Sequence, residues 1–356
     1  MNSLTMLYKR ARLFKELFLG KTLGKRAPVG LFVLVTNRCQ MRCSYCFVDH
    51  KLRERELSTK EVLDLIDEGY RMGTRLVCLM GGEPLIRDDI DVIVDHIVSK
   101  GIICDITTNG LLIKDKLDVV KKADMLMVSL DGDEKANDLN RGPGSYKKIL
   151  EGIKVARENG VVTRINTVLS KNNMDSVDHI LSLAKQYGMY VTFSITAEAC
   201  GGSEKIQEML LSDEETRNIY KQIKKLKSRG QPILFSHHTL DHVINYPLSY
   251  SQIIQRDDEK HKGYCTRKCM FGNQLGYVDS NGKVYPCATL WQTYKAKSIL
   301  DVGLRQAWDN MKNLTCQTCS CPSAPEWDYL TSPQGIIDGI KFTIKQAASQ
   351  FRRKYE

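Results

Sequence analysis

The chain has 356 residues, of which 42% are hydrophobic and 26% are charged, and its formal net charge is +10. These proportions are typical of a soluble globular protein with one large domain, or a large domain and a small one. The sequence has no run of about 18 uninterrupted apolar residues and no secretory leader, which argues against membrane-spanning and secreted proteins. We therefore expect a cytoplasmic protein, with peripheral contact to the inner membrane surface as an open alternative.

The first segment, residues 1–29, is basic and amphipathic, and residues 331–356 repeat the pattern. Apolar residues recur in the first segment at helical spacing: Leu4, Leu7, Phe14, Leu17 and Phe18. Two interpretations are open for such a helix. It lies in an anionic membrane interface, or it packs across one end of the catalytic domain and leaves its basic face in water. No aromatic-interleaved basic motif or zinc-finger spacing is present, so we expect no nucleic-acid partner.

Strand and helix patterns alternate from residue 30 to about residue 200. Strands are predicted over 31–36, 75–80, 103–107, 125–130, 162–168 and 190–195. Helices are predicted between them, over 59–72, 88–100, 115–122, 145–159 and 174–187. Such alternation predicts right-handed βαβ units and a parallel sheet, with the chemistry at the C-terminal ends of the strands.

Nine of the twelve cysteines fall into two groups, three in the first and six in the second. The remaining Cys78, Cys104 and Cys200 are interpreted as buried small residues in a reducing compartment. The first group, Cys39, Cys43 and Cys46, has the spacing C-x3-C-x2-C directly after the first predicted strand. Three thiolates on a four-iron cluster leave one iron open to bind a substrate or cofactor. Structural zinc is the alternative, and it would need a fourth ligand such as Asp49 or His50.

This loop, followed by Phe47 and preceded by the apolar run Leu31–Val35, resembles the signature of the radical S-adenosylmethionine (SAM) superfamily. The resemblance implies a [4Fe–4S] cluster whose open iron chelates SAM, and reductive cleavage of SAM to a 5′-deoxyadenosyl radical that abstracts hydrogen from a substrate. It also implies an α/β fold, a partial (β/α)6 TIM-like barrel over 30–230. Flavodoxin or ferredoxin would supply the electron.

Further motifs of the family follow the predicted strands. Gly81–Gly82–Glu83–Pro84 resembles its GGEP motif, Thr107–Gly110 its TNG element and Ser129–Gly132 its SLDG element. Arg141 follows the last of these, where either a structural or a SAM-contacting role is open. The resemblance implies a set of SAM-binding residues: Tyr45, Phe47, Gly81, Gly82, Glu83, Asn109, Ser129, Arg164 and Asn166. For Arg164 and Asn166, a polar rim of the barrel is the alternative.

Residues 231–264 are interpreted as a linker. It contains the run Ser236–His242, whose three histidines and Asp241 are interpreted as a surface or substrate-side cluster and not as a metal site. General acids or bases are sought among Glu198, His237, His238, Tyr264 and Cys265, without a choice among them.

The second cysteine group, within residues 265–330, opens with a spacing that resembles the SPASM and twitch extensions of the family. Apolar runs at 275–278 and 283–285 flank Asp279–Gly282, which predicts a β-hairpin. The resemblance implies one auxiliary [4Fe–4S] cluster on Cys269, Cys287, Cys316 and Cys319, with Cys265 and Cys321 as alternative ligands. The spacing after Cys319 departs from the family pattern, which leaves the choice of ligands open. A zinc ribbon is the alternative.

Three functions are weighed. The first is oxidation, decarboxylation or carbon–carbon bond formation on a small-molecule or lipid-like substrate. Basic amphipathic ends favour it, and so does the short segment before the first cysteines, which leaves no room for a leader-recognition domain. The second is maturation of a ribosomal precursor peptide. The third, a non-catalytic metal scaffold, would leave the GGEP, TNG and SLDG motifs without a role.

Overall fold

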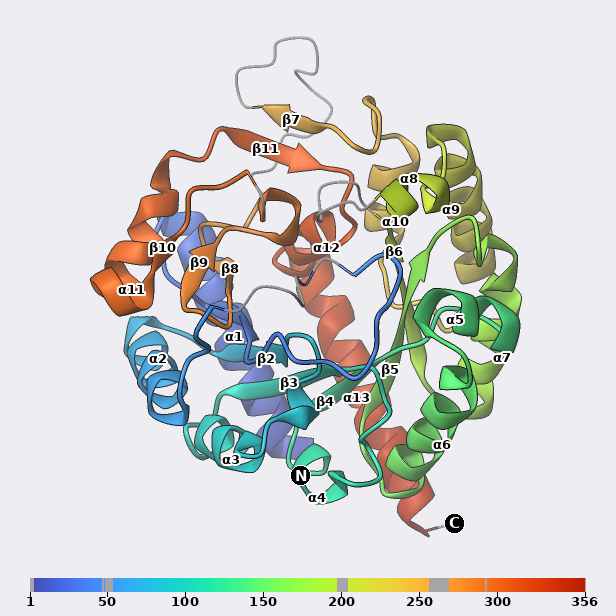
Figure 1. Ribbon diagram of the computed structural model, residues 1–356, viewed down its shortest axis with the longest axis horizontal. Helices are drawn as coiled ribbons and strands as arrows, with labels where there is room; N and C mark the ends of the chain where they lie inside the picture. The colour runs from blue at the N-terminus through green and yellow to red at the C-terminus, as the bar shows by residue number, and fades with distance from the viewer. Residues whose placement is uncertain are drawn as a thin grey trace.

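The computed structural model describes residues 3–46, 48, 54–196, 204–255, 269–291 and 293–355 (Figure 1). Several residues considered above lie outside these ranges: Phe47, Asp49, His50, Glu198, Cys200, Tyr264 and Cys265. None of the described helices is long and apolar enough to cross a membrane.

Six parallel strands, neighbours in chain order, form the centre of the molecule (Figure 1). They are β1 (Gly30–Leu34), β2 (Leu76–Met80), β3 (Ile103–Thr108), β4 (Met125–Ser129), β5 (Thr163–Leu169) and β6 (Tyr190–Ile195). The predicted α/β class and partial barrel are confirmed, and the strand limits agree with the predicted ones to within two residues. Along each strand, Val, Ile and Leu side chains that point outward alternate with side chains that point into the barrel. The outward residues suit a pleated surface that helices cover.

Helices cover the outer face of these strands: α2 (Thr59–Met72), α3 (Ile90–Ser99), α4 (Leu117–Val120), α6 (Ser145–Glu158) and α7 (Val177–Gln186). The short helix α5 (Glu134–Arg141) follows β4 and packs against α6. The start of α2 shows why they form where they do. Ser58 and Glu61 make a capping box, and Gly73 ends the helix with a φ of 114°, a conformation in which side chains are disfavoured. Alternate strand residues such as Leu31, Val33 and Ile106 pack beneath these helices.

The predicted hairpin is present as β8 (Leu275–Val278) and β9 (Lys283–Tyr285), which pair antiparallel. Gly282 sits in its turn with a φ of 84°. The sequence did not predict where the hairpin lies. β8 pairs in parallel with β1, and with β10 (Lys297–Ser298) it extends the barrel sheet to nine strands in the order β10-β9-β8-β1-β2-β3-β4-β5-β6.

The two ends of the chain, α1 (Ser3–Leu23) and α13 (Pro333–Tyr355), run side by side behind the sheet (Figure 1). Lys9 on α1 forms a buried ion pair of 2.9 Å with Asp124, the residue just before β4. Leu17 is fully buried, and Phe342 on α13 packs edge-on against Tyr190 at the start of β6. The described part of α1 therefore buries one face against the N-terminal ends of the strands, as the packed-helix interpretation requires.

The other helices and strands lie at the two edges of the sheet and near its C-terminal strand ends, with α11 at the β10 edge and α9 and α10 near β6 (Figure 1). They are α8 (Glu204–Met209), α9 (Asp213–Ser228), α10 (His237–Ile244), β7 (Ile253–Gln255), α11 (Ile299–Asp309), β11 (Cys316–Cys319) and α12 (Ser323–Leu330). β7 and β11 pair antiparallel. The segment interpreted as a linker thus contains the helix α10, whose N-cap Ser236 hydrogen-bonds Glu326 on α12.

Candidate active site

The first three cysteines lie in the loop that leaves the C-terminal end of β1, and all three are half-buried. Polar groups from two other strand ends contact their sulfur atoms. Asn109, after β3, directs Nδ2 to Sγ of Cys39 at 3.6 Å. Arg141, at the end of α5, directs Nη1 to Sγ of Cys43 at 3.9 Å. The loop is therefore held by donors that would stabilise negative charge on sulfur.

Burial raises the pKa of each of the three thiols, and that of Cys46 reaches about 11. Metals bind such groups as thiolates, so a bound metal centre would favour loss of these protons. Burial raises the pKa of Cys78, outside both cysteine groups, to about 12 as well, so the pKa values do not by themselves mark a metal site. What points to a metal centre is the set of three sulfur ligands on one loop, which suits an iron–sulfur cluster.

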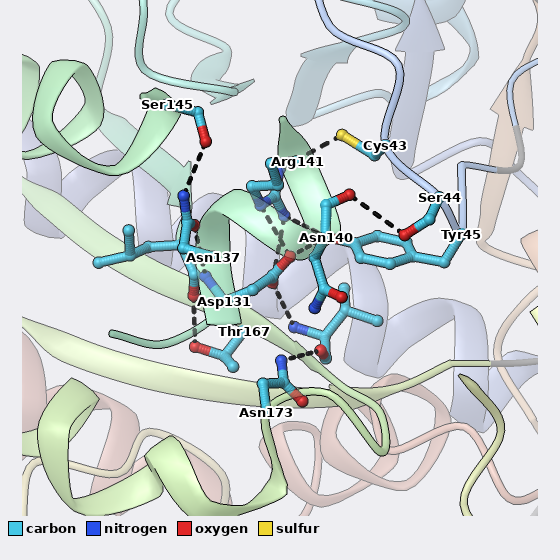
Figure 2. Close-up of polar contacts among 12 residues, drawn as sticks. Cys43, Ser44, Tyr45, Asp131, Asn137, Asn140, Arg141, Ser145, Thr167 and Asn173 are labelled. Atoms are coloured by element: carbon cyan, nitrogen blue, oxygen red, sulfur yellow. Dashed lines mark hydrogen bonds and ion pairs between the residues drawn. The ribbon is translucent and has the colours of Figure 1, made fainter. Parts of the chain in front are cut away.

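A buried ion pair stands behind the cysteine loop (Figure 2). Nε of Arg141 lies 2.8 Å from Oδ2 of Asp131, and both side chains are at most 5% exposed. Tyr45 joins this pair, since its hydroxyl donates to Asp131 and accepts from Arg141. Arg141 also lies over the Tyr45 ring, with Cζ 5.6 Å from the ring centroid. Tyr45, predicted to be one of the SAM-binding residues, is thus fixed at its hydroxyl end.

The same pair is connected to the barrel strands by further hydrogen bonds (Figure 2). Oδ1 of Asp131 accepts from the backbone N–H of Val168 at 3.1 Å, and its own N–H donates to Asn137 at 3.1 Å. The carbonyl of Asn140 accepts from the backbone N–H and the hydroxyl of Ser44 at 3.0 and 3.2 Å. The C-terminal end of α5 thereby fixes the middle of the cysteine loop.

The Gly81–Gly82–Glu83 turn follows β2 and packs against the chain that leads to the cysteines. A Cβ on Gly81 would lie 2.3 Å from the carbonyl oxygen of Thr36, and one on Gly82 would lie 2.4 Å from that of Arg38. Both glycines are therefore required by the close approach of two backbones. Ligand approach, the reason expected from the sequence, is not needed to explain them.

Glu83 is fully buried, and its carboxylate makes its contacts within the protein. It accepts from the Asn109 N–H at 2.7 Å, the Thr108 hydroxyl at 2.8 Å and the Leu85 N–H at 3.1 Å. Burial nevertheless raises its pKa to about 7. The structure thus uses Glu83 to join the ends of β2 and β3, and it places Asn109 beside the cysteines. A direct contact of this carboxylate with SAM stays a prediction.

Ser129, Arg164 and Asn166 all lie on the inner face of the barrel and are half-buried. Ser129 and Asn166 are register partners on β4 and β5. The side-chain oxygen of Asn166 accepts from Thr192 at 2.9 Å and from Ser194 at 3.0 Å, which turns its NH2 group away from them. Arg164 lies one inward position closer to the start of β5. Its electrostatic neighbours are Asp105, Arg10 and Cys78, near the N-terminal strand ends.

The second group of thiols is also assembled in the structure. Cys269 precedes β8, Cys287 follows β9, and Cys316, Cys319 and Cys321 lie on or just after β11. Electrostatic contacts join Cys269 to Cys287, Cys316 and Cys321, and Cys319 hydrogen-bonds Cys321. Burial raises the pKa of Cys287 to about 12. Cys321, kept as an alternative ligand, thus belongs to the same group of interacting thiols.

The histidines of α10 are separated by the fold. His237 and His238 are exposed, whereas Nε2 of His242 lies 2.9 Å from the carbonyl oxygen of Cys319. Within the described ranges, no three His, Cys, Asp or Glu side chains converge as the ligands of a single metal ion do. The thiolates of a cubane bind different iron atoms and need no such convergence.

Comparison with known proteins gives the family. Residues 33–184, from β1 to α7, match the Radical SAM superfamily. This part of the chain is a radical SAM domain. The AdoMet-dependent heme synthase of Methanosarcina barkeri is 28% identical over 290 residues, which cover 78% of this chain and 80% of that protein. The Fe-coproporphyrin III synthase of the same organism is 26% identical over 295 residues, 78% of this chain and 73% of that one.

A solved structure, Streptococcus suis SuiB bound to precursor peptide SuiA, has a similar fold. Its TM-score is 0.66 at 18% identity, and the match covers 86% of this chain and 74% of that chain. At this identity the likeness is one of fold. It covers 86% of the chain, which is more than the six-stranded barrel.

The residues present fit the cofactors of a radical SAM protein, a [4Fe–4S] cluster and SAM. The fit rests on three thiols at one strand end, with Asn109 and Arg141 as donors to sulfur. The sequence missed two parts of this radical SAM site, Asp131 and Asn140. Asp131 stood inside the SLDG element, so a signal was present, but its pairing with an arginine ten residues later could not be read from spacing. Asn140 acts through its backbone carbonyl. Every residue has such a carbonyl, so the residue type gives no indication of this role.

Proposed function

We propose that this radical SAM enzyme reductively cleaves SAM to a 5′-deoxyadenosyl radical and abstracts hydrogen from a small-molecule substrate, with oxidation or decarboxylation as the outcome. One observation carries the proposal: three thiols lie after the end of β1, and two of them are contacted by side-chain donors, Cys39 by Nδ2 of Asn109 and Cys43 by Nη1 of Arg141. Cys39, Cys43 and Cys46 would hold the cluster, which supplies an electron to SAM. A low-potential carrier such as flavodoxin or ferredoxin would reload it.

The SAM-contacting residues are part of the proposal. Ser129 and Asn166 lie half-buried on the inner face, where they would contact SAM, and Asn109 would act at the thiols through its Nδ2 contact with Cys39. Gly81 and Gly82 would offer the backbone of their turn. Tyr45 would present its ring, because its hydroxyl is held by Asp131 and Arg141. Phe47 lies outside the described residues. Exclusion of water by the barrel would protect a radical from side reactions.

A small-molecule substrate is favoured by the relatives that match over most of this chain. Both are named as synthases of a heme or of Fe-coproporphyrin III, and they align with 78% of its length. A peptide substrate is the second candidate, because SuiB, whose structure holds a precursor peptide, has a similar fold over 86% of the chain. The sequence match to these synthases covers 78% of this chain, whereas the likeness to SuiB is one of fold, so we place the small molecule first.

An auxiliary [4Fe–4S] cluster is proposed on the second thiol group. Cys269, Cys287, Cys316 and Cys319 remain the first choice of ligands, and the contacts of Cys321 support it as a replacement for one of the β11 cysteines. Cys265 lies outside the described residues. Such a cluster would accept an electron from a substrate radical, which fits an oxidative outcome.

The test is anaerobic reconstitution of the full chain with iron and sulfide, followed by dithionite and SAM. We expect release of 5′-deoxyadenosine from the wild type and none from the Cys43→Ala variant. Incubation with fractionated metabolites and, separately, with peptides then identifies the substrate class. Zinc in place of iron in the oxygen-protected protein, or no 5′-deoxyadenosine from the reconstituted wild type, would refute the proposed function.

A further inference from the structure

The second thiol group is assembled from two parts of the fold that are anchored differently. Cys269 and Cys287 flank the hairpin β8–β9, which belongs to the nine-stranded barrel sheet. Cys316 and Cys319 begin and end β11, which forms a two-stranded sheet with β7. A two-stranded sheet is at best marginally stable by itself. The β11 cysteines therefore need further contacts to be held opposite the other two.

Helix α10 makes a direct contact with the end of β11. Nε2 of His242, in the last turn of α10, lies 2.9 Å from the carbonyl oxygen of Cys319. A carbonyl oxygen can only accept a hydrogen bond, so Nε2 carries the proton and donates it. The hydroxyl of the next residue, Ser320, donates to the carbonyl of Tyr250 at 2.7 Å. Two successive residues at the end of β11 are thereby bound to α10 and to the chain that follows it.

His242 is itself held in place. Its ring centroid lies 6.0 Å from that of Tyr246, at an interplanar angle of 41°. Tyr246 is fully buried, and its hydroxyl donates to the carbonyl of Gln252 at 2.8 Å. At the other end of α10, the hydroxyl of Ser236 donates to Glu326 on α12 at 2.8 Å. The imidazole donor is thus carried by a helix that is fixed at both ends, as a group that orients a metal ligand needs to be.

The β11 segment also contacts the other half of the thiol group. The N–H of Cys269 donates to the carbonyl of Gln317 at 3.4 Å. Cys319 has electrostatic contacts with Cys269 and Cys287. A shift of β11 relative to the hairpin would therefore change the separations of the sulfur atoms. Because an iron–sulfur cubane needs its ligands at fixed separations, a group that positions β11 also controls how well the cluster is bound.

We propose that His242 is a positioning residue for the auxiliary cluster. Its hydrogen bond to the carbonyl of Cys319 holds β11 opposite the hairpin, and it places the positive end of an N–H group beside a ligand residue. Hydrogen bonds around the ligands help to set the potential of an iron–sulfur cluster, so this donor favours the reduced, more negative form. The inference rests on the auxiliary cluster of the proposed function and adds a residue that the cysteine spacing does not indicate.

The test compares His242→Leu with His242→Gln in full-length protein whose first three cysteines are replaced by alanine, so that the iron–sulfur signal comes from the auxiliary cluster. We expect His242→Leu to lower the midpoint potential in an EPR-monitored redox titration, and to speed the loss of iron to a chelator on the order of tenfold. His242→Gln, whose amide can donate to the same carbonyl, should restore both in part.

His179→Leu is the matched control. This half-buried histidine of α7 makes a hydrogen bond of 2.7 Å through Nε2 to the hydroxyl of Tyr146, so it resembles His242 in exposure and bonding. It lies between α6 and α7 on the outer face of the barrel, away from the thiols. Its replacement should change neither the midpoint potential nor the rate of iron loss.

An unchanged midpoint potential in His242→Leu, or a fall that His242→Gln does not reverse in part, would overturn the inference. If His242→Leu does not fold, His242→Phe decides in the same way, because it keeps a flat ring against Tyr246 and has no donor. Absence of iron from the background protein would refute the auxiliary cluster of the proposed function, and this inference with it. A bound cluster that is indifferent to His242 refutes this inference alone.

Discussion

The guanidinium of Arg141 reaches the sulfur of Cys43, with Nη1 3.9 Å from Sγ. The same side chain is paired with Asp131 through Nε at 2.8 Å, and neither is more than 5% exposed. A buried cation thus stands at one ligand of the proposed cluster, and a buried anion stands behind it. Because nearby charge and hydrogen bonds to sulfur help to set the potential of an iron–sulfur cluster, this relationship is open to direct test.

We expect Arg141→Gln to lower the midpoint potential of the first cluster, because the reduced, more negative cluster loses a stabilising cation. Asp131→Asn should shift the potential the other way, since it removes the anion that offsets Arg141. An EPR-monitored redox titration of the reconstituted variants measures both. Shifts in the same direction would show that the pair acts only through the fold of the loop.

The buried pair of Lys9 and Asp124 is expected to anchor α1. Lys9→Met removes the ion-pair partner of the buried Asp124 carboxylate, which keeps its hydrogen bond from the Cys104 N–H at 2.7 Å. Breaking a buried pair in this way costs about 3 kcal/mol or more. Urea unfolding of Lys9→Met measures the loss, and Lys15→Met, at an exposed lysine of the same helix, should stay within about 0.5 kcal/mol of the wild type. Equal effects of the two variants would contradict the anchoring role.

The stability of the protein should fall as the pH rises from about 4 to about 7, in part because of Asp105. Burial raises the pKa of this carboxyl from its ordinary 3.8 to about 7 in the folded state. In that window the unfolded chain has lost the proton and the folded chain keeps it, so stability declines with pH and levels off above 7. Asp105→Asn should reduce the decline in stability between pH 4 and 7, by a few kcal/mol of unfolding free energy at most.

Thermal midpoints at several pH values measure the Asp105 effect, with Asp115→Asn, at an exposed aspartate, as the control. A curve for Asp105→Asn that runs parallel to that of the wild type between pH 4 and 7 would show that Asp105 titrates normally in the fold.

The sequence predicted the barrel well because its signal is local. Aliphatic strand residues alternate with inward ones, and capping residues such as Ser58 and Gly73 mark helix ends. The hairpin was also local, with Gly282 at its turn. Its pairing with β1 was not predictable, because the choice of a parallel neighbour depends on how the whole chain closes around the barrel. The same holds for α1, whose buried face fits either a membrane or a protein.

Within the site, the sequence indicated which residues take part better than it indicated which groups their side chains contact. Glu83 was expected to contact SAM, and that contact stays a prediction; the unforeseen part is that its carboxylate accepts from Thr108 and Asn109 at the end of β3 and from the N–H of Leu85. Arg164 and Asn166 were correctly placed on one face of β5, but two residues of strand span roughly 7 Å. That distance puts Arg164 toward the start of the strand, where Asp105 is its electrostatic neighbour. An acidic residue within a predicted buried strand was visible in the sequence and could have indicated this pairing.

Iron content tests the second thiol group. Cys287→Ser should lower the iron content by about four atoms per chain, one cubane, and leave the first cluster in place. Cys104→Ser, at a buried cysteine outside both groups, should change nothing. Single serine variants of Cys316, Cys319 and Cys321 then show which of the three is dispensable. Retention of all the iron in Cys287→Ser would remove this cysteine from the ligand set.

The last prediction concerns the outer face of α1 and α13. This face keeps apolar side chains in water, including Leu4 at 72% and Ile344 at 59% exposed. Phe14 contacts the Gly339 position of α13, and Arg10 donates to Thr343 at 2.7 Å, so the two helices form one surface. Its apolar residues and the surrounding lysines suit an anionic bilayer. We expect co-sedimentation with phosphatidylserine vesicles that weakens at high salt.

The double variant Leu4→Glu with Ile344→Glu should abolish this binding, whereas Val92→Glu, at an exposed residue of α3, should not. Failure of the wild type to sediment would leave α1 and α13 as a cover for the barrel only. Binding would in turn orient the enzyme, because this surface lies at the N-terminal strand ends and the three cysteines lie at the other. The active site would then face away from the bilayer, which favours a water-soluble substrate over one drawn directly from the lipid.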